Sequence, residues 1–410
     1  MLSQTVRPLL AEQYADMLAQ NHRMRGVLLS SHSHTPGDLT RFDQRMLKCL
    51  KGMTLLKGLS SAYLRGQLQE PLSAGELFAT ALFAASTDDE FLLSGCIGLS
   101  QALPRLLPVL LSVAGWMPAQ SALWPLMLSL PACRAYVAVV RSDLAASVAF
   151  SQQEIQTLIE QGRYVDFLLN FLCRSTSPLF VPALETVFSS GRDELILQGC
   201  RAVLCSHPLT DEHTGTAIRH LVQLAHSERD DIRLHAVRSL LTCQAGLPHS
   251  ELSVLTEEGP DTRLRIQAMG WSGLPGYIPS LLTYFDSPEY ARLSVLSVIA
   301  ITGSLPEQDG WLRKRDDDVY SPASPDSADI PARDPEQGVG WPERAAFADW
   351  WRTQGENFAH NTPYLCGQLT SPEGLNRVLR QGYLNLRSLA LLRLGIFPER
   401  AALPAERQKG

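Results

Sequence analysis

An apolar phrase that contains an arginine recurs through the second half of the chain. The segment 231–237 (DIRLHAV) is followed by related segments at 261–266 (DTRLRI), 291–296 (ARLSVL) and 384–389 (LNLRSL). The first three copies are about 30 residues apart, which is the period of stacked helical hairpins. A hairpin of this size cannot bury its own apolar face, so neighbours must stack into one core. The repeat therefore predicts an all-α fold built as a solenoid.

The helical pattern divides the chain into four segments. Residues 1–72 are expected to form an N-terminal helical cap, and residues 73–304 the α-solenoid. Residues 305–340 combine proline, serine and acidic residues with few apolar anchors, which predicts a polar, mobile and exposed insertion. Residues 341–410 are expected to form C-terminal helical repeats, with a polar tail that frays beyond Ala401.

Local patterns predict where individual helices begin. Ser73 and Glu76 have the spacing of a capping box, in which each side chain binds a free backbone N–H of the first helical turn. Asp38 or Thr40 is expected to cap the preceding long helix.

The stretch between Arg105 and Arg134 contains no charged residue and is long enough to span a bilayer. However, prolines at 108, 118, 125 and 131 interrupt it, and proline breaks a helix. We therefore expect two short buried helices that join near residues 116–118. No membrane partner is expected.

Charge and cysteine content limit the class of function. The chain of 410 residues carries 36 basic and 42 acidic side chains, a net charge of −6, whereas a surface that wraps nucleic acid needs a basic stripe. None of the eight cysteines forms a CxxC pair, so they are expected to be small buried residues in a reducing compartment. The N-terminus lacks the pattern of a secretory signal. These features predict a cytoplasmic protein with no nucleic-acid partner.

The repeated arginines, Arg233, Arg263 and Arg292, allow two interpretations. They either line a groove that binds an anion, or form a structural ladder with acids at neighbouring helix starts such as Asp230 and Asp261. The ladder is favoured, because acidic residues stabilise helix N-termini and stacked helices bring successive repeats together.

No other pattern assembles a chemical site. The five clustered histidines lack the spacing of a zinc site, and they are His207, His213, His220, His226 and His235. The acidic run 316–318 lacks the spacing of a calcium loop and is expected to be solvated. No phosphate-binding loop or nucleophile elbow is present. The sequence thus assigns no catalytic, cofactor-binding or metal-binding residue, and predicts a protein that is not an enzyme.

Three C-terminal tryptophans, Trp341, Trp350 and Trp351, have two interpretations. Tryptophan is favoured at binding hot spots, so they are candidate anchors for a partner. Packing within the C-terminal helices is the favoured alternative. The residues that bind protein stay unknown at this level.

Several phrases resemble known repeat proteins. The segment 231–237 is similar to the second helix of a HEAT-type repeat, which implies an α-solenoid of HEAT-like helical hairpins. The segments 38–45, 75–81 and 357–367 resemble an uncharacterised family of bacterial HEAT-like proteins, often encoded near type VI secretion genes. The pair Lys48-Cys49 and the polar insertion depart from that family's pattern.

The resemblance implies a protein-binding scaffold, an adaptor or chaperone whose partner is a secreted effector or a component of the secretion apparatus. Two alternatives remain. One is a helical-repeat enzyme that acts on nucleic acid, which requires a basic concave face, and the other is an immunity protein that blocks a toxin.

Overall fold

The computed structural model is mostly helical, as the repeat predicts. It describes residues 6–206, 212–242, 253–255, 261–313, 336, 338–396, 398–405 and 407. Within these ranges, strands occur only in two hairpins of two residues per strand. The fold is therefore all-α.

The chain divides into two compact units. Residues 1–220 and 383–410 form the first unit, and residues 221–382 form the second. These limits differ from those of the four segments expected from the sequence, which stay a prediction.

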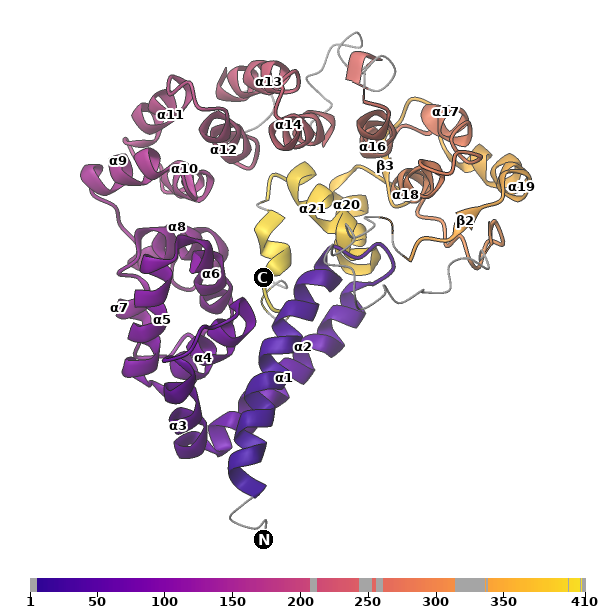
Figure 1. Cartoon of the computed structure of the whole chain (residues 1–410). Helices are drawn as coiled ribbons and strands as arrows, with labels where there is room; N and C mark the ends of the chain where they lie inside the picture. The colour runs from indigo at the N-terminus through magenta and orange to yellow at the C-terminus, as the bar shows by residue number, and fades with distance from the viewer. Residues whose placement is uncertain are drawn as a thin grey trace. The chain divides into compact units, whose positions relative to one another are not determined.

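The helices of the first unit are connected by short turns, and 3₁₀ turns carry the letter η (Figure 1). In chain order the elements are α1 (Val6–Leu29), α2 (Pro36–Leu55), α3 (Lys57–Gln67), α4 (Ala74–Thr87), α5 (Glu90–Ala102), η1 (Pro104–Leu106), α6 (Leu107–Trp116), α7 (Trp124–Met127), α8 (Pro131–Val140), η2 (Ala145–Ser147), α9 (Gln152–Gln161), α10 (Val165–Arg174), α11 (Phe180–Phe188), α12 (Asp193–Leu204), α13 (Glu212–Leu224), α21 (Leu384–Arg393) and η8 (Pro398–Ala402). The boundary between the units falls within α13.

Alternate helices pack together along this unit. Helix α4 contacts α6, α6 contacts α8, α8 contacts α10, and α10 contacts α12. The long helices α1 and α2 lie side by side, and α1 also packs on α4 (Figure 1). Gly75 permits that approach, since a Cβ atom there would lie 2.5 Å from the carbonyl oxygen of Ala19. Successive helices of this unit therefore share packing contacts along the chain.

Of the two N-terminal caps predicted from the sequence, the structure has the one at α4 and not the one at α2. Ser73 accepts a hydrogen bond from the backbone N–H of Glu76, whose carboxylate accepts one from the Ser73 N–H, so the capping box is confirmed. The predicted cap of α2 was wrong. Thr35 is the N-cap, and Asp38 acts at the third helical position, where its carboxylate accepts from the Thr35 N–H at 2.9 Å.

The uncharged stretch between Arg105 and Arg134 forms α6, α7 and the start of α8, so the helices are short and buried as predicted, with a break after Trp116, but they number three and not two. Each of these helices has a proline in its first turn, where the missing N–H has no helical partner to lose. None of the helices described for this chain combines the length and the apolar character that a membrane span needs.

The C-terminal residues of the first unit dock on α1 and α2. Arg25 is 3% exposed and its guanidinium donates to the carboxylate of Asp43 at 2.6 Å and to the carbonyl oxygens of Ala402 and Leu403. The second oxygen of Asp43 accepts from the N–H of Ala405. A frayed tail beyond Ala401 was predicted from its polar composition, and this is wrong for the described residues, because Arg25 and Asp43 satisfy its backbone groups.

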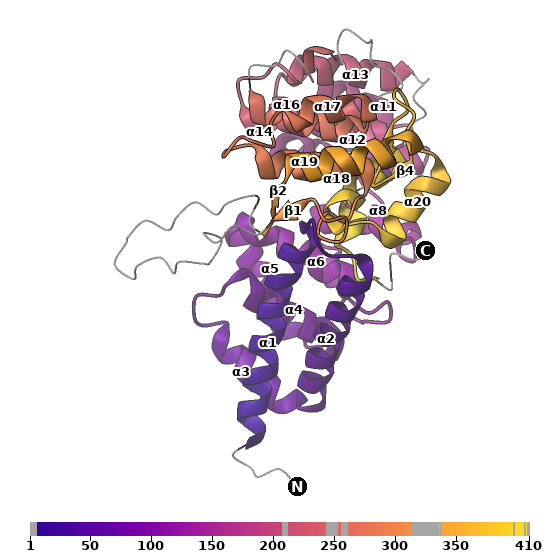
Figure 2. The same ribbon diagram turned by 90° about the vertical axis from the view of Figure 1, so that its right-hand side faces the viewer.

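The second unit contains α14 (Asp230–Thr242), α16 (Thr262–Ser272), η5 (Pro275–Tyr277), α17 (Ile278–Leu282), α18 (Ala291–Thr302), β1 (Leu312–Arg313), β2 (Trp341–Pro342), α19 (Arg344–Gln354), η7 (Gly355–Asn357), β3 (Tyr364–Leu365), β4 (Gln368–Leu369) and α20 (Pro372–Gln381). Helix α16 packs on both α14 and α18, and α18 also contacts the β1–β2 hairpin (Figure 2).

The described parts of the predicted polar insertion include both exposed and buried residues, since residues 307–310 are exposed and Trp311 and Glu336 are buried. Trp311 is fully buried against Phe285 and Phe347, and Leu312 pairs with Pro342 in the β1–β2 hairpin. Glu336 is 5% exposed. The expectation that residues 305–340 are exposed therefore agrees with the exposure of residues 307–310, and it is wrong for Trp311 and Glu336, where an aromatic cluster and an ion pair with Arg263 hold the chain. Residues 314–335 and 337, which include the acidic run, lie outside the described residues.

Candidate functional site: an arginine groove in the first unit

Of the repeated arginines, Arg233 pairs with acids at helix starts, as the ladder interpretation predicts, whereas Arg263 and Arg292 bind Glu336. Arg233 contacts Asp230 at 2.6 Å and Asp261, at the start of the next repeat helix, at 3.8 Å. Arg263 pairs with the carboxylate of Glu336, and Arg292 donates to the Glu336 carbonyl oxygen at 3.3 Å. The partner Glu336 was not predicted, because it is more than forty residues from either arginine in the sequence.

Two of the clustered histidines, His213 and His220, contact aromatic rings. His213 contacts the edge of Phe180 with ring centroids 5.9 Å apart, and His220 lies 4.6 Å from Phe188. Over the described parts of the chain, no three His, Cys, Asp or Glu side chains are grouped so that they could hold a metal ion. His207 lies outside these parts.

The tryptophans pack in the second unit. Trp350 and Trp351 lie 5.5 Å and 6.4 Å from Phe347, and Trp341 lies beneath the guanidinium of Arg292. Trp350 and Trp351 remain partly exposed. These contacts favour the packing interpretation.

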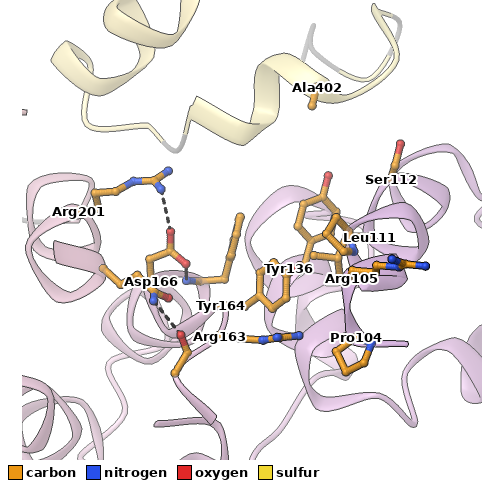
Figure 3. Close-up of a pocket in the computed structure, with 14 residues that line it drawn as sticks. Pro104, Arg105, Leu111, Ser112, Tyr136, Arg163, Tyr164, Asp166, Arg201 and Ala402 are labelled. Atoms are coloured by element: carbon orange, nitrogen blue, oxygen red, sulfur yellow. Dashed lines mark hydrogen bonds and ion pairs between the residues drawn. The ribbon is translucent and has the colours of Figure 1, made fainter. Parts of the chain in front are cut away.

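An open groove of about 590 Å³ lies in the first unit, and we call it the arginine groove (Figure 3). It is bordered by η1, α6, α8, α10, α12 and η8. Buried Leu111, Tyr136 and Phe167 contribute its apolar surface, while Arg105 and Arg163 are exposed. Ala402 of the docked C-terminal segment also lines the groove. The hydrogen bond from Arg25 to the Ala402 carbonyl oxygen therefore holds part of the groove lining in place.

The turn between α9 and α10 presents Arg163 to the groove. Gly162 ends α9 with φ +70°, a conformation that suits glycine, and Tyr164 adopts φ +57° before α10. Gln198 of α12 holds both sides of the turn: its side-chain oxygen accepts from the Val165 N–H at 2.9 Å and its amide donates to the Gly162 carbonyl at 3.0 Å. Two left-handed residues and one bridging side chain thus fix the backbone on either side of Arg163.

The groove has an excess of positive charge. Buried Asp166 pairs with Arg201 at 3.3 Å, so these two charges offset each other (Figure 3). Among the described residues, neither Arg105 nor Arg163 has an ion-pair partner. Burial raises the pKa of the Tyr164 hydroxyl to about 12, so it stays neutral and able to donate a hydrogen bond. The groove therefore offers apolar surface beside two cations that are available to an acidic ligand.

Sequence reasoning missed this groove. Arg105, Arg163 and Arg201 lie outside the repeated apolar phrase, and they come from separate elements: η1, the turn between α9 and α10, and α12. One local signal was present, since Gly162 follows an amphipathic helix as C-terminal glycines do. The glycine predicts the end of a helix, but it does not indicate that the following turn borders a groove. Comparison with protein-family models, with curated proteins and with solved structures finds no match for this chain.

Proposed function

We propose that this protein is a non-catalytic binding scaffold, an α-solenoid of HEAT-like hairpins that holds a segment of another protein in the arginine groove. The observation that carries the proposal is the lining of that groove. Exposed Arg105 and Arg163 stand beside the surfaces of Tyr136 and Phe167. Arginine and aromatic residues are enriched where proteins bind one another, because they combine contact area with directed hydrogen bonds.

The mechanism is recognition by a preformed surface. Asp166 pairs with Arg201, and Gln198 bridges the turn that carries Arg163, so the groove is held by contacts made before any partner arrives. A preformed site lowers the conformational entropy lost on binding. A stable complex would bury on the order of 800 Å² on each partner, which extends beyond the groove itself.

The resemblance to bacterial HEAT-like proteins suggests the class of partner. We propose that the protein acts in the cytoplasm as an adaptor or chaperone for a type VI secretion effector or spike component. Support for this part is the likeness of segments 38–45, 75–81 and 357–367 to that family.

The test compares two charge reversals in the first unit. Arg163→Glu places an acid in the groove, and Arg45→Glu makes the same change on exposed α2. Tagged wild-type and variant proteins are purified from native lysate, and the recovered proteins are quantified by mass spectrometry. We expect one protein to be recovered with the wild type and with Arg45→Glu, and to be lost with folded Arg163→Glu.

Two outcomes would contradict the proposal. The first is equal recovery of every protein by all three forms. The second is turnover of nucleic acid by the pure protein, which would favour an enzyme. If the recovered partner is a toxin whose activity the protein blocks, the scaffold would be an inhibitor and not an adaptor.

A further inference from the structure

A second groove adjoins the arginine groove in the first unit. It has a volume of about 430 Å³, and we call it the apolar groove because Leu107, Leu130 and Leu158 contribute to its lining. Arg163 is the one charged residue among the described residues that border it. Pro104 and Arg163 border both grooves. The two hollows therefore meet at this pair, and Arg105 adds to the arginine groove alone a second positive charge that is unpaired among the described residues.

The structure points to a single ligand that spans both grooves. We propose that one continuous segment of the partner protein binds across them, with an apolar stretch in the apolar groove and an acidic stretch beside Arg105 and Arg163. This inference rests on the proposed function and adds the chemistry of the bound segment. Charge complementarity carries the argument, since both arginines lack an acidic partner within the described residues.

The contrast between the grooves favours a polypeptide over a nucleic acid. A nucleic acid carries a phosphate at every nucleotide, so its affinity depends on cations repeated along the whole path. In the apolar groove the lining offers leucines where such cations would be needed. A polypeptide places apolar and acidic residues in separate stretches, which matches the division seen here.

The turn between α9 and α10 holds Arg163 at the point where the two grooves meet. Gly162 and Tyr164 both have positive φ and flank Arg163, and Gln198 bonds to the backbone on both sides. A non-glycine residue in this conformation is uncommon, because its Cβ atom is crowded by the backbone. Tyr164 also lines the arginine groove, so the strained position presents a ring and a hydroxyl to the bound segment.

Photo-crosslinking tests where the segment lies. The photoreactive residue p-benzoylphenylalanine replaces exposed Thr157 in the apolar groove, exposed Pro108 in the arginine groove, or exposed Arg45 as a control outside both. Each full-length protein is irradiated in native lysate, and the crosslinked peptides are sequenced by mass spectrometry. We expect Thr157 to link to an apolar stretch and Pro108 to an acidic stretch of the same continuous partner segment.

A synthetic peptide of the crosslinked segment then tests the charges. Replacing its acids by their amides, or Arg105→Gln or Arg163→Gln in the protein, should weaken binding by roughly two- to fivefold for each arginine removed. Added salt should weaken binding of the acidic peptide to the wild-type protein. It should have little effect on binding of the amidated peptide to a protein in which both arginines are replaced by glutamine. The variant Gln198→Ala leaves both arginines present but removes the two hydrogen bonds that hold the turn and a side chain that lines the arginine groove, so it should also lower affinity.

The outcomes separate this inference from the proposed function. If no protein is linked above the Arg45 control, the proposed function fails and the inference fails with it. If a partner is linked but the two positions reach distant, basic or uncharged segments, only the inference is overturned. Displacement of the peptide by a single-stranded oligonucleotide at equal affinity would also overturn it.

Discussion

His22 makes the stability of the first unit depend on pH. It lies on α1, where its ring stacks on Phe78 at a centroid distance of 3.8 Å and its Nε2 lies 3.2 Å from the Ser112 hydroxyl of α6. Burial, followed by the positive charge of Arg25, lowers the pKa of His22 from 6.5 to about 4. Protonation therefore favours the unfolded chain, where the imidazole is hydrated.

The size of the effect follows from these two pKa values. Above pH 6.5 the imidazole is neutral in both states, and its contribution to stability is fully present. Between pH 6.5 and 4 the unfolded chain binds more protons, so the free energy of unfolding falls as the pH is lowered. Lowering the pH from 7.5 to 5 should remove about 2 kcal/mol. Most carboxylates stay ionised over this range, which keeps their contribution small.

Urea unfolding measured at steps between pH 7.5 and 5 checks the prediction. His22→Phe retains a ring against Phe78 but cannot be protonated, so its stability should lose about 2 kcal/mol less than that of the wild type. His226→Gln removes an exposed histidine and is the control. A wild-type slope that persists in His22→Phe would refute the assignment.

The remaining predictions concern close packing and the buried ion pair. Gly75→Ala should lower the free energy of unfolding by about 1–3 kcal/mol, because the added methyl meets the carbonyl oxygen of Ala19 on α1. Gly26→Ala has open space around it and should raise the free energy of unfolding by up to about 1 kcal/mol. Urea unfolding that gives the two changes the same sign would contradict this. Arg25→Met should cost about 3–5 kcal/mol, since it leaves Asp43 buried without its cation, and Arg41→Met at an exposed pair less than about 1 kcal/mol. Equal shifts in Tm for these two variants would show that burial does not decide how much each ion pair contributes to stability.

The sequence predicts helices well where one local rule decides the outcome. The capping box at Ser73 and the break of the uncharged stretch at prolines depend on neighbours within a few residues. Helix α2 shows the limit of such rules, because Thr35, Asp38 and Thr40 are all of residue types that can cap a helix, and the helix begins after Thr35.

Features that depend on distant residues were not predictable in the same way. Leu403 is 1% exposed although it lies in the segment expected to fray, and Arg25, which is 378 residues earlier in the chain, binds its carbonyl oxygen. Trp311 lies in a segment whose composition suggests exposure, yet rings from Phe285 and Phe347 enclose it. The arginine groove has the same origin, since its lining comes from separate hairpins. A periodic pattern records which face of each helix is buried and carries no information on which side chains meet at their ends.

The chain order of the first unit limits how this protein can be divided. Residues 383–410 belong to the same compact unit as residues 1–220, with the second unit inserted between them in sequence. A chain cut at residue 220 would lose Ala402, Leu403 and Ala405, so Arg25 and Asp43 would keep each other but lose three backbone partners in a buried setting. Unpaired buried polar groups are costly, and the same cut removes Ala402 from the groove lining. The binding groove and the folding of its unit therefore depend on the same C-terminal residues, and binding is best measured on the full chain.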